Sequence, residues 1–316
     1  ECIIGPPVCM RCRHLLCVGL GVLLLWGSGG AWATGSAWAQ GMDRVVGTVL
    51  AQFEEARALA VDPRGRLYVA DAGRSVVGIF EADGTRRDVL GGAGTRPGTF
   101  DTPSDIDPTN GQALLVADTY NGRIQRFSTE GQYLESLPVG QTGRRAAGEW
   151  TFQDGQGGAS VQGDVRPIGV ARDDEGAVFV LDSRNRQVWK WSDVGQARAV
   201  VSGRGGRLQD PVALALGPDR RLYVADAGRE AVLIYDAVGT FRRRVPGLAP
   251  AAVQALAVHR GRLWVVCPRR VLVWDRAVGV VAEHTVDLGE PLVDVAVYQD
   301  RAYLLTETRL LRRPAW

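Results

Sequence analysis

Hydrophobic residues fall into short runs of four or five, and turn-forming residues separate these runs along most of the chain. The clearest run, Leu114–Ala117, precedes the turn residues Asp118–Gly122 and a second apolar segment, Ile124–Phe127. Aspartate, asparagine and glycine favour tight turns, whereas short apolar runs bounded by such turns favour strands. Residues 114–127 are therefore predicted to form a β-hairpin.

This hairpin recurs at intervals of about 40–50 residues, which is the spacing of propeller and solenoid repeats. Five other apolar runs end at residues that correspond to Asp118: Asp71, Asp182, Asp226, Cys267 and Thr306. Each copy begins with a strand of small and large residues and ends with a third and a frayed fourth strand. Four antiparallel strands repeated six times predict an all-β fold, a six-bladed β-propeller.

Residues 40–316 are predicted to form one propeller domain. The interval between Asp118 and Asp182 is too long for one repeat, which places a glycine-rich insertion at about residues 137–165. This insertion is expected to be either a solvated loop or a ligand-gripping lid. The sixth repeat has only three strands, so the strand predicted at residues 44–50 supplies the fourth. That closure pairs two sheet edges that would otherwise be free.

The segment Asp118-Thr-Tyr-Asn-Gly-Arg-Ile-Gln-Arg-Phe127, with Pro103 ahead of the first strand, resembles an NHL repeat. The copies at Asp71, Asp182 and Asp226 are similar, but Cys267 and Thr306 depart from the pattern. The resemblance covers about residues 45–316. It implies a propeller of the kind that serves as a binding scaffold, a sensor or, occasionally, a lyase or hydrolase.

Residues 1–39 have the order of a secretory signal peptide, with Met10 as the expected start. Basic residues at Arg11 and Arg13 precede the apolar segment 15–26, and small residues follow at Ala33 and Ala39. The apolar segment is shorter than the roughly 20 residues of a membrane span. We expect cleavage after Ala33 or Ala39, a secreted or periplasmic protein, and no membrane span after cleavage. The alternative is an uncleaved anchor.

Charge and cysteine content exclude several classes of protein. The formal net charge of +2 does not indicate a nucleic-acid surface. Four of the five cysteines precede the cleavage sites, and the mature chain keeps only Cys267, which excludes an intrachain disulfide and a thiolate metal cluster. Cys267 is expected to be a buried small hydrophobic residue. The protein is expected to be a monomer.

A ring of arginines is the first candidate binding site. Each repeat places one arginine beside the turn before its third strand: Arg74, Arg123, Arg186, Arg229, Arg270 and Arg309. Arginine suits carboxylate and phosphate ligands, and Trp150 in the insertion could stack on such a ligand. The alternative is structural, with the arginines paired to acidic residues of the blade connections: Asp101, Asp164, Asp210 and Glu290.

Three carboxylates form the second candidate site. Asp105 and Asp294 replace the small residue of the innermost strand in two repeats, and Asp107 lies two residues further on. Carboxylates near the channel need water, an arginine or a cation as a partner. A hydrated channel and a calcium or ligand site both remain open. No other cofactor is expected. The aspartates at the hairpin turns are expected to cap their own turns.

The residues favour a binding protein over an enzyme. A lyase or dehydrogenase of propeller type would bring histidines to the channel, but His259 and His284 are not expected to point there. No catalytic residue or Ser/His/Asp arrangement stands out. We therefore expect a non-catalytic propeller that binds a protein, a cell-surface glycan or another anionic ligand. The alternative is a metal-assisted hydrolase or lyase that uses Asp105, Asp107 and Asp294.

Overall fold

The computed structural model describes residues 47–108, 111–139, 143–146, 149–152, 165–191, 197–200, 206–246, 248 and 252–316. Residues 1–46, which include the expected signal peptide, lie outside this description, and the cleavage sites stay a prediction. Within the described residues the fold is all-β, with one short 3₁₀ helix, η1 (Ala227–Arg229), and no α-helix. None of its helices is long and apolar enough to cross a membrane.

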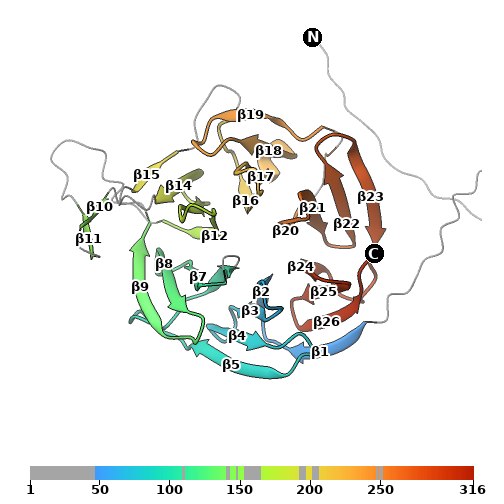
Figure 1. Ribbon diagram of the computed structural model, residues 1–316, viewed down its shortest axis with the longest axis horizontal. Helices are drawn as coiled ribbons and strands as arrows, with labels where there is room; N and C mark the ends of the chain where they lie inside the picture. The colour runs from blue at the N-terminus through green and yellow to red at the C-terminus, as the bar shows by residue number, and fades with distance from the viewer. Residues whose placement is uncertain are drawn as a thin grey trace, which may run out of the picture. The chain divides into compact units, whose positions relative to one another are not determined.

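Twenty-four strands form six sheets of four antiparallel strands, arranged around a central channel (Figure 1). This confirms the predicted six-bladed propeller. The strands of the first three blades are β2 (Ala56–Val61), β3 (Leu67–Asp71), β4 (Val76–Phe80) and β5 (Arg86–Gly91); β6 (Pro103–Asp107), β7 (Ala113–Asp118), β8 (Arg123–Ser128) and β9 (Tyr133–Pro138); and β12 (Pro167–Arg172), β13 (Val178–Asp182), β14 (Gln187–Trp191) and β15 (Ala197–Ala199).

The other three blades have the same order. Their strands are β16 (Pro211–Leu216), β17 (Leu222–Asp226), β18 (Ala231–Tyr235) and β19 (Phe241–Arg244); β20 (Ala255–His259), β21 (Arg262–Cys267), β22 (Arg270–Asp275) and β23 (Gly279–Thr285); and β24 (Leu292–Tyr298), β25 (Arg301–Thr306), β26 (Arg309–Pro314) and β1 (Thr48–Gln52). The first strand of each blade lies at the channel, apart from β1, which is the outer strand of the sixth blade (Figure 1).

The insertion carries a further hairpin of two strands, β10 (Gly143–Ala146) and β11 (Glu149–Phe152), in which Arg145 pairs with Trp150. This hairpin lies on the outer side of the ring near β15 (Figure 1). The side chains of the hairpin, that of Trp150 included, lie outside the described residues.

The hydrophobic core is divided into six clusters, and each cluster lies between two neighbouring blades. Between the fourth and fifth blades, for example, Ile234 packs in one cluster with Val265 and Trp274. Cys267, which is buried in that cluster, has the expected role of a small hydrophobic residue. Because every blade is covered on both faces, its second strand is buried on both faces, as in β3 and β17, where every residue is buried.

The aspartates at the hairpin turns connect each hairpin to the chain that enters its blade. Asp118 accepts a 2.7 Å hydrogen bond from the backbone N–H of Asp101, and Asp226 accepts two from the corresponding connection. The expected local cap is present at Asp182, which accepts from the N–H of Arg184. In all four turns the carboxylate also accepts a hydrogen bond from a backbone N–H some 16 residues earlier in the sequence. The interaction that the four turns share is therefore not the local cap that was expected.

The strand β1 closes the ring, because it pairs antiparallel with β26, with Thr48 opposite Arg312 and Gln52 opposite Arg309. The first and last segments of the propeller thus share one sheet, as predicted from the three-stranded sixth repeat. Leu50 and Ala51 also pack against the core between the sixth and first blades.

Deletion of residues 44–52 should therefore destabilise the protein by several kcal/mol, since each ladder hydrogen bond contributes about 0.5–1.5 kcal/mol apart from the burial of Leu50. Urea unfolding of the truncated and full-length proteins measures the loss. An unchanged free energy of unfolding would show that the ring is closed by other contacts.

Candidate functional site

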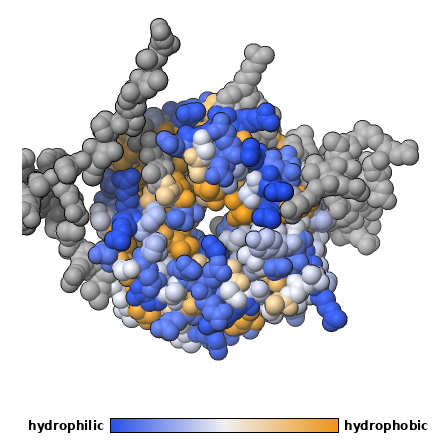
Figure 2. All heavy atoms as spheres, turned by 180° about the vertical axis from the view of Figure 1, so that it is seen from behind, coloured by the Kyte–Doolittle hydropathy of each residue, from blue (hydrophilic) through white to orange (hydrophobic). Residues whose placement is uncertain are grey.

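A cavity of about 570 Å³ occupies the middle of the channel and opens at one end of the inner strands. The later residues of all six inner strands line it, together with the turns that follow them, such as Asp62–Pro63 and Gly217–Pro218. Its volume is in the range of small-molecule sites. Seen from the side opposite to that of Figure 1, the middle of the ring is hollowed and hydrophobic residues lie beside the hollow (Figure 2).

The hairpin turns with their aspartates lie at the other end of the inner strands. In the second blade Pro103, which begins β6, pairs with Asp118, whereas Asp107, near the end of β6, lines the cavity. The expected arginine ring and the cavity are therefore at opposite ends of the channel.

Asp105 and Asp294 line the cavity, and each connects two neighbouring blades. Asp294 accepts hydrogen bonds from the backbone N–H groups of Val295 (2.7 Å) and of Leu59 in the next blade (2.8 Å). Asp105 accepts from Ile106 in its own blade (2.8 Å) and from Val170 in the next (2.7 Å). These backbone donors are partners that sequence reasoning did not consider.

Burial opposes ionisation of both carboxyl groups. Desolvation raises the pKa of Asp294 from 3.8 to about 7, although the two N–H donors act in the opposite direction. The pKa of Asp105 is also raised well above its usual value, first by desolvation and then by the charges of Asp294 and Asp107. Each carboxyl group therefore holds a proton at pH values where an exposed aspartate is ionised.

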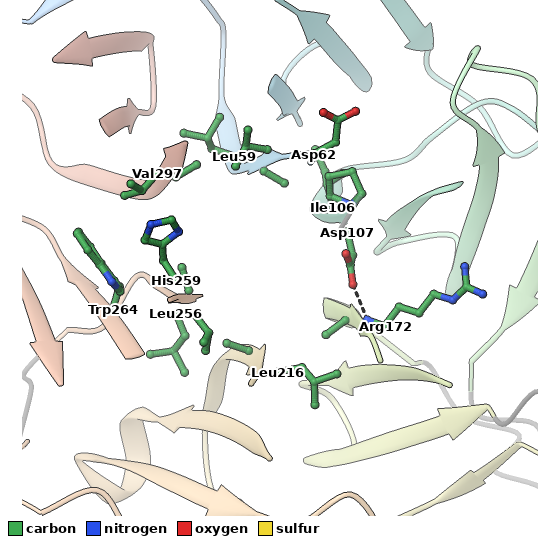
Figure 3. Close-up of a pocket in the computed structure, with 18 of the residues that line it drawn as sticks. Leu59, Asp62, Ile106, Asp107, Arg172, Leu216, Leu256, His259, Trp264 and Val297 are labelled. Carbon is green, nitrogen blue, oxygen red and sulfur yellow. Dashed lines mark hydrogen bonds between the residues drawn. The ribbon is translucent and has the colours of Figure 1, made fainter. Parts of the chain in front are cut away.

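Asp107 and His259 complete the polar lining. Asp107 accepts a hydrogen bond from the backbone N–H of Arg172 in the next blade, and the His259 ring points into the channel from β20 (Figure 3). Burial and the neighbouring Arg260 lower the pKa of His259, which favours the neutral imidazole. Trp264 lies beside His259 in a T-shaped contact with 6.3 Å between ring centroids.

The position of His259 corrects the sequence interpretation, in which neither histidine pointed at the channel. Counting four residues from the small inner-strand position gives Asp62 from Ala58, and the same count from Ala255 gives His259. Both residues line the cavity. Superposition of the repeats thus gives His259 the position of Asp62, but the sequence alone does not show that this position reaches the cavity.

No group of three His, Cys, Asp or Glu side chains among the described residues has the arrangement of a metal site. The channel carboxylates are turned toward backbone N–H groups of neighbouring blades rather than toward one common point. These residues do not fit the metal-assisted form of the alternative interpretation. Binding of calcium in the channel stays a prediction, which metal analysis of the purified protein tests.

The six arginines differ in their surroundings. Arg123 is half-buried, and its Nε donates to the fully buried Asp118 at 2.8 Å. Arg309 pairs with Glu290 at 3.1 Å, the partner expected from sequence. Arg74 is close to two carboxylates, and Arg186 is exposed and has no ion pair among the described residues. Arg229 lies near its turn aspartate, and Arg270 forms an exposed pair with Glu283.

These contacts favour the structural alternative for Arg123, which also donates to the carbonyl oxygens of Arg96 and Thr99 at 2.9 and 3.1 Å. The use of the arginine ring as a binding site for an anionic ligand stays a prediction, as does stacking by Trp150.

Replacement of Arg123 by alanine should lower the free energy of unfolding by about 2–3 kcal/mol, because it removes charge-assisted hydrogen bonds from a buried carboxylate. Replacement of the exposed Arg270 by alanine is the matched control and should cost about 0–1 kcal/mol. Urea unfolding of the two variants makes the comparison. Equal losses would contradict the structural role of Arg123.

The raised pKa of Asp294 gives a second prediction. The folded state binds this proton up to a higher pH than the unfolded state does. The contribution of Asp294 to stability is therefore complete below about pH 4 and is lost as the pH rises to about 7. The loss is on the order of 4 kcal/mol, at 1.36 kcal/mol per pKa unit.

The variant Asp294→Asn lacks this titration. Its free energy of unfolding, compared with that of the wild type at the same pH, should therefore become relatively more favourable from pH 4 to pH 7.5. Urea unfolding at several pH values measures the difference. A difference that is constant, or that changes in the opposite direction, would mean that Asp294 ionises normally in the folded protein.

The fold is shared with solved structures of distant sequence. A gluconolactonase from Xanthomonas campestris is 20% identical with a TM-score of 0.61, over 84% of this chain and 88% of that chain. Virginiamycin B lyase from Staphylococcus aureus, solved with quinupristin, is 12% identical with a TM-score of 0.57, over 80% and 78%. A chain of the nidogen–laminin complex is 16% identical with a TM-score of 0.56, over 82% and 84%.

No protein-family model matches the chain, and no curated protein matches it by sequence. The comparisons overturn the non-catalytic interpretation, because the structural neighbours include enzymes such as gluconolactonase and a luciferin-regenerating enzyme. They agree better with the enzymatic alternative. At these identities the likeness itself establishes the six-bladed propeller fold alone.

Proposed function

We propose that the protein is a propeller-type enzyme, a hydrolase or lyase, that acts on a small molecule in the channel cavity. The observation that carries the proposal is Asp294, a buried carboxyl group with a pKa of about 7 that lines this cavity. A general acid or base works best when its pKa is near the working pH. Perturbed carboxyl groups in a cleft are typical of catalytic sites, although structural networks perturb pKa values too.

Proton transfer by Asp294 is the step common to both reaction classes. In hydrolysis of an ester or lactone, the Asp294 carboxylate removes a proton from water while the water oxygen bonds to the carbonyl carbon. The bond to the leaving oxygen then breaks, and that oxygen receives the proton. In elimination, the same carboxylate removes a proton from carbon, the C–H electron pair forms a double bond to the adjacent carbon, and the leaving group departs from that carbon with its bonding pair and receives the proton. The gluconolactonase neighbour makes lactones the first substrates to try.

Asp105 and His259 have supporting roles. Burial raises the pKa of the Asp105 carboxyl group, and in its protonated form this group can donate a hydrogen bond to substrate. The neutral imidazole of His259, which points into the channel, can accept or donate one (Figure 3). The apolar side chains of Leu59 and Leu256 on the same lining limit the access of water.

The repeats resemble NHL repeats, and the nidogen–laminin neighbour is compatible with such a scaffold. Action outside the cytoplasm is supported by the order of basic, apolar and small residues in positions 11–39. Both points stay part of the proposal.

The test is an assay of hydrolysis with a panel of aliphatic and sugar lactones, in which the acid released is measured. The value of kcat/KM should rise as the pH increases through about 7, since the base must lose its proton. Asp294→Asn should lower kcat/KM about 10²–10⁴-fold. The variant Asp83→Asn, in an exposed turn between β4 and β5, is the matched control and should retain full activity. Activity of Asp294→Asn equal to that of the wild type would exclude Asp294 as the base.

A further inference from the structure

The inner strand of each blade has one edge paired with the second strand and one edge that faces the channel and the next blade. In four blades the backbone N–H of the residue after the small inner-strand position is directed to this free side, and the strand register gives the corresponding residues of the other two blades the same place. The six residues are Leu59, Ile106, Val170, Leu214, Leu256 and Val295. A buried N–H group without an acceptor costs free energy, so each of these donors needs a partner.

Two aspartates supply acceptors for four of the six N–H groups. Asp294 accepts from Val295 and from Leu59, and Asp105 accepts from Ile106 and from Val170, all at 2.7–2.8 Å. In both cases one carboxylate spans the donor of its own blade and the donor of the next blade. The repeated geometry defines a slot for a carboxylate between two blades.

The two remaining donors, Leu214 and Leu256, belong to neighbouring blades. Leu214 follows a bulge after Pro211 and lies opposite Val224, as Val170 follows a bulge after Pro167 and lies opposite Val180. Among the described residues no side chain accepts a hydrogen bond from the N–H of Leu214 or of Leu256. Both residues line the cavity.

The Leu214 nitrogen lies close to an inner-strand residue of the neighbouring blade. A Cβ atom built on Gly169 would lie 3.6 Å from the Leu214 nitrogen. Gly169 has the same place in its blade as Asp105 in the second blade, whose carboxylate reaches the next blade's Val170 nitrogen. The Leu214 nitrogen therefore lies next to the third blade, as the Val170 nitrogen lies next to the second.

The slots follow every second blade around the ring. Asp105 comes from the second blade and Asp294 from the sixth, and the corresponding residue of the fourth blade is Ala213. The third slot thus has both of its donors, Leu214 and Leu256, but a methyl group where the other two slots have a carboxylate. We propose that this third slot binds the carboxylate of a ligand, which accepts from the two N–H groups as Asp105 and Asp294 do in theirs.

Charges of both signs line the cavity. Arg172 and Arg220 lie on the same lining as Asp62, Asp107, Asp173 and Asp174, and Arg220 pairs with Asp173 at 3.2 Å. Asp105 and Asp294 repel an anion less than ordinary aspartates, because burial keeps them protonated to higher pH. Donors fixed by the sheets also need no rearrangement to meet the ligand.

This inference deepens the proposed function. It rests on that function in one respect only, which is that the bound carboxylate is taken to be part of a substrate. A substrate held in the third slot would carry a carboxylate on the side opposite to the reacting group. Binding can be measured without turnover, so the site and the reaction can fail separately.

The experiment is a titration of the ¹⁵N-labelled protein with acetate, followed through the backbone amide signals of Leu214 and Leu256, with acetamide as the neutral control of similar size. We expect saturable shifts of both signals with acetate and shifts at least tenfold smaller with acetamide at equal concentration. Absence of acetate shifts at Leu214 and Leu256, or equal shifts with acetamide, would overturn the proposal.

Ala213→Asp supplies the missing carboxylate from the chain itself and should abolish the response to acetate. Ala213→Asn, which brings an uncharged acceptor oxygen, serves the same purpose if the aspartate variant does not fold. Ala58→Asp is the matched control, because both donors beside Ala58 already have acceptors, and it should leave the acetate response unchanged. An acetate response that persists in the folded Ala213 variants would contradict the third slot.

Discussion

The free inner edges of the six sheets are the constraint on which the rest of the structure depends. Each inner strand brings backbone N–H groups to the channel side of its sheet, where they have no strand to pair with and need another acceptor. Asp105 and Asp294 satisfy four of these donors, and each also connects its blade to the next. The carboxyl groups at the centre therefore stabilise blade contacts and at the same time give the channel its chemistry.

The same architecture makes the cavity rigid. Each hydrophobic cluster belongs to two blades, so a displacement of one blade would disturb two clusters and the pairing of β1 with β26 that closes the ring. The lining residues come from strands whose positions are fixed from both sides. Fixed donors and carboxyl groups are what catalysis by preorganised polar groups requires.

The repeat pattern was sufficient to predict the fold. The hairpin at Asp118 and its copies indicated six blades, and the incomplete sixth repeat indicated closure by an N-terminal strand. The site was predicted only in part. Asp105, Asp107 and Asp294 were found because carboxylates replace small residues in a repeat, whereas their N–H partners come from adjacent blades and leave no sign in the sequence. His259 was missed because a turn residue was not expected to reach the cavity.

The interpretation of the binding face depended on charge that the structure largely compensates. A ring of arginines produces a strong field only where the guanidinium groups lack partners, but Arg123 and Arg309 have close carboxylates and backbone acceptors. The cavity lies at the opposite end of the channel.

At that end, the structural role of Asp294 is compatible with its proposed role as a base. Each carboxylate oxygen that accepts one N–H still has a second lone pair, so Asp294 can join two blades and exchange a proton. The N–H donors favour the ionised form and burial favours the neutral form, with burial dominant. The balance leaves the pKa of the group at about 7, near the value that suits a general base. A channel built on carboxylates between blades thus acquires a titratable centre from the same interactions that hold the ring together.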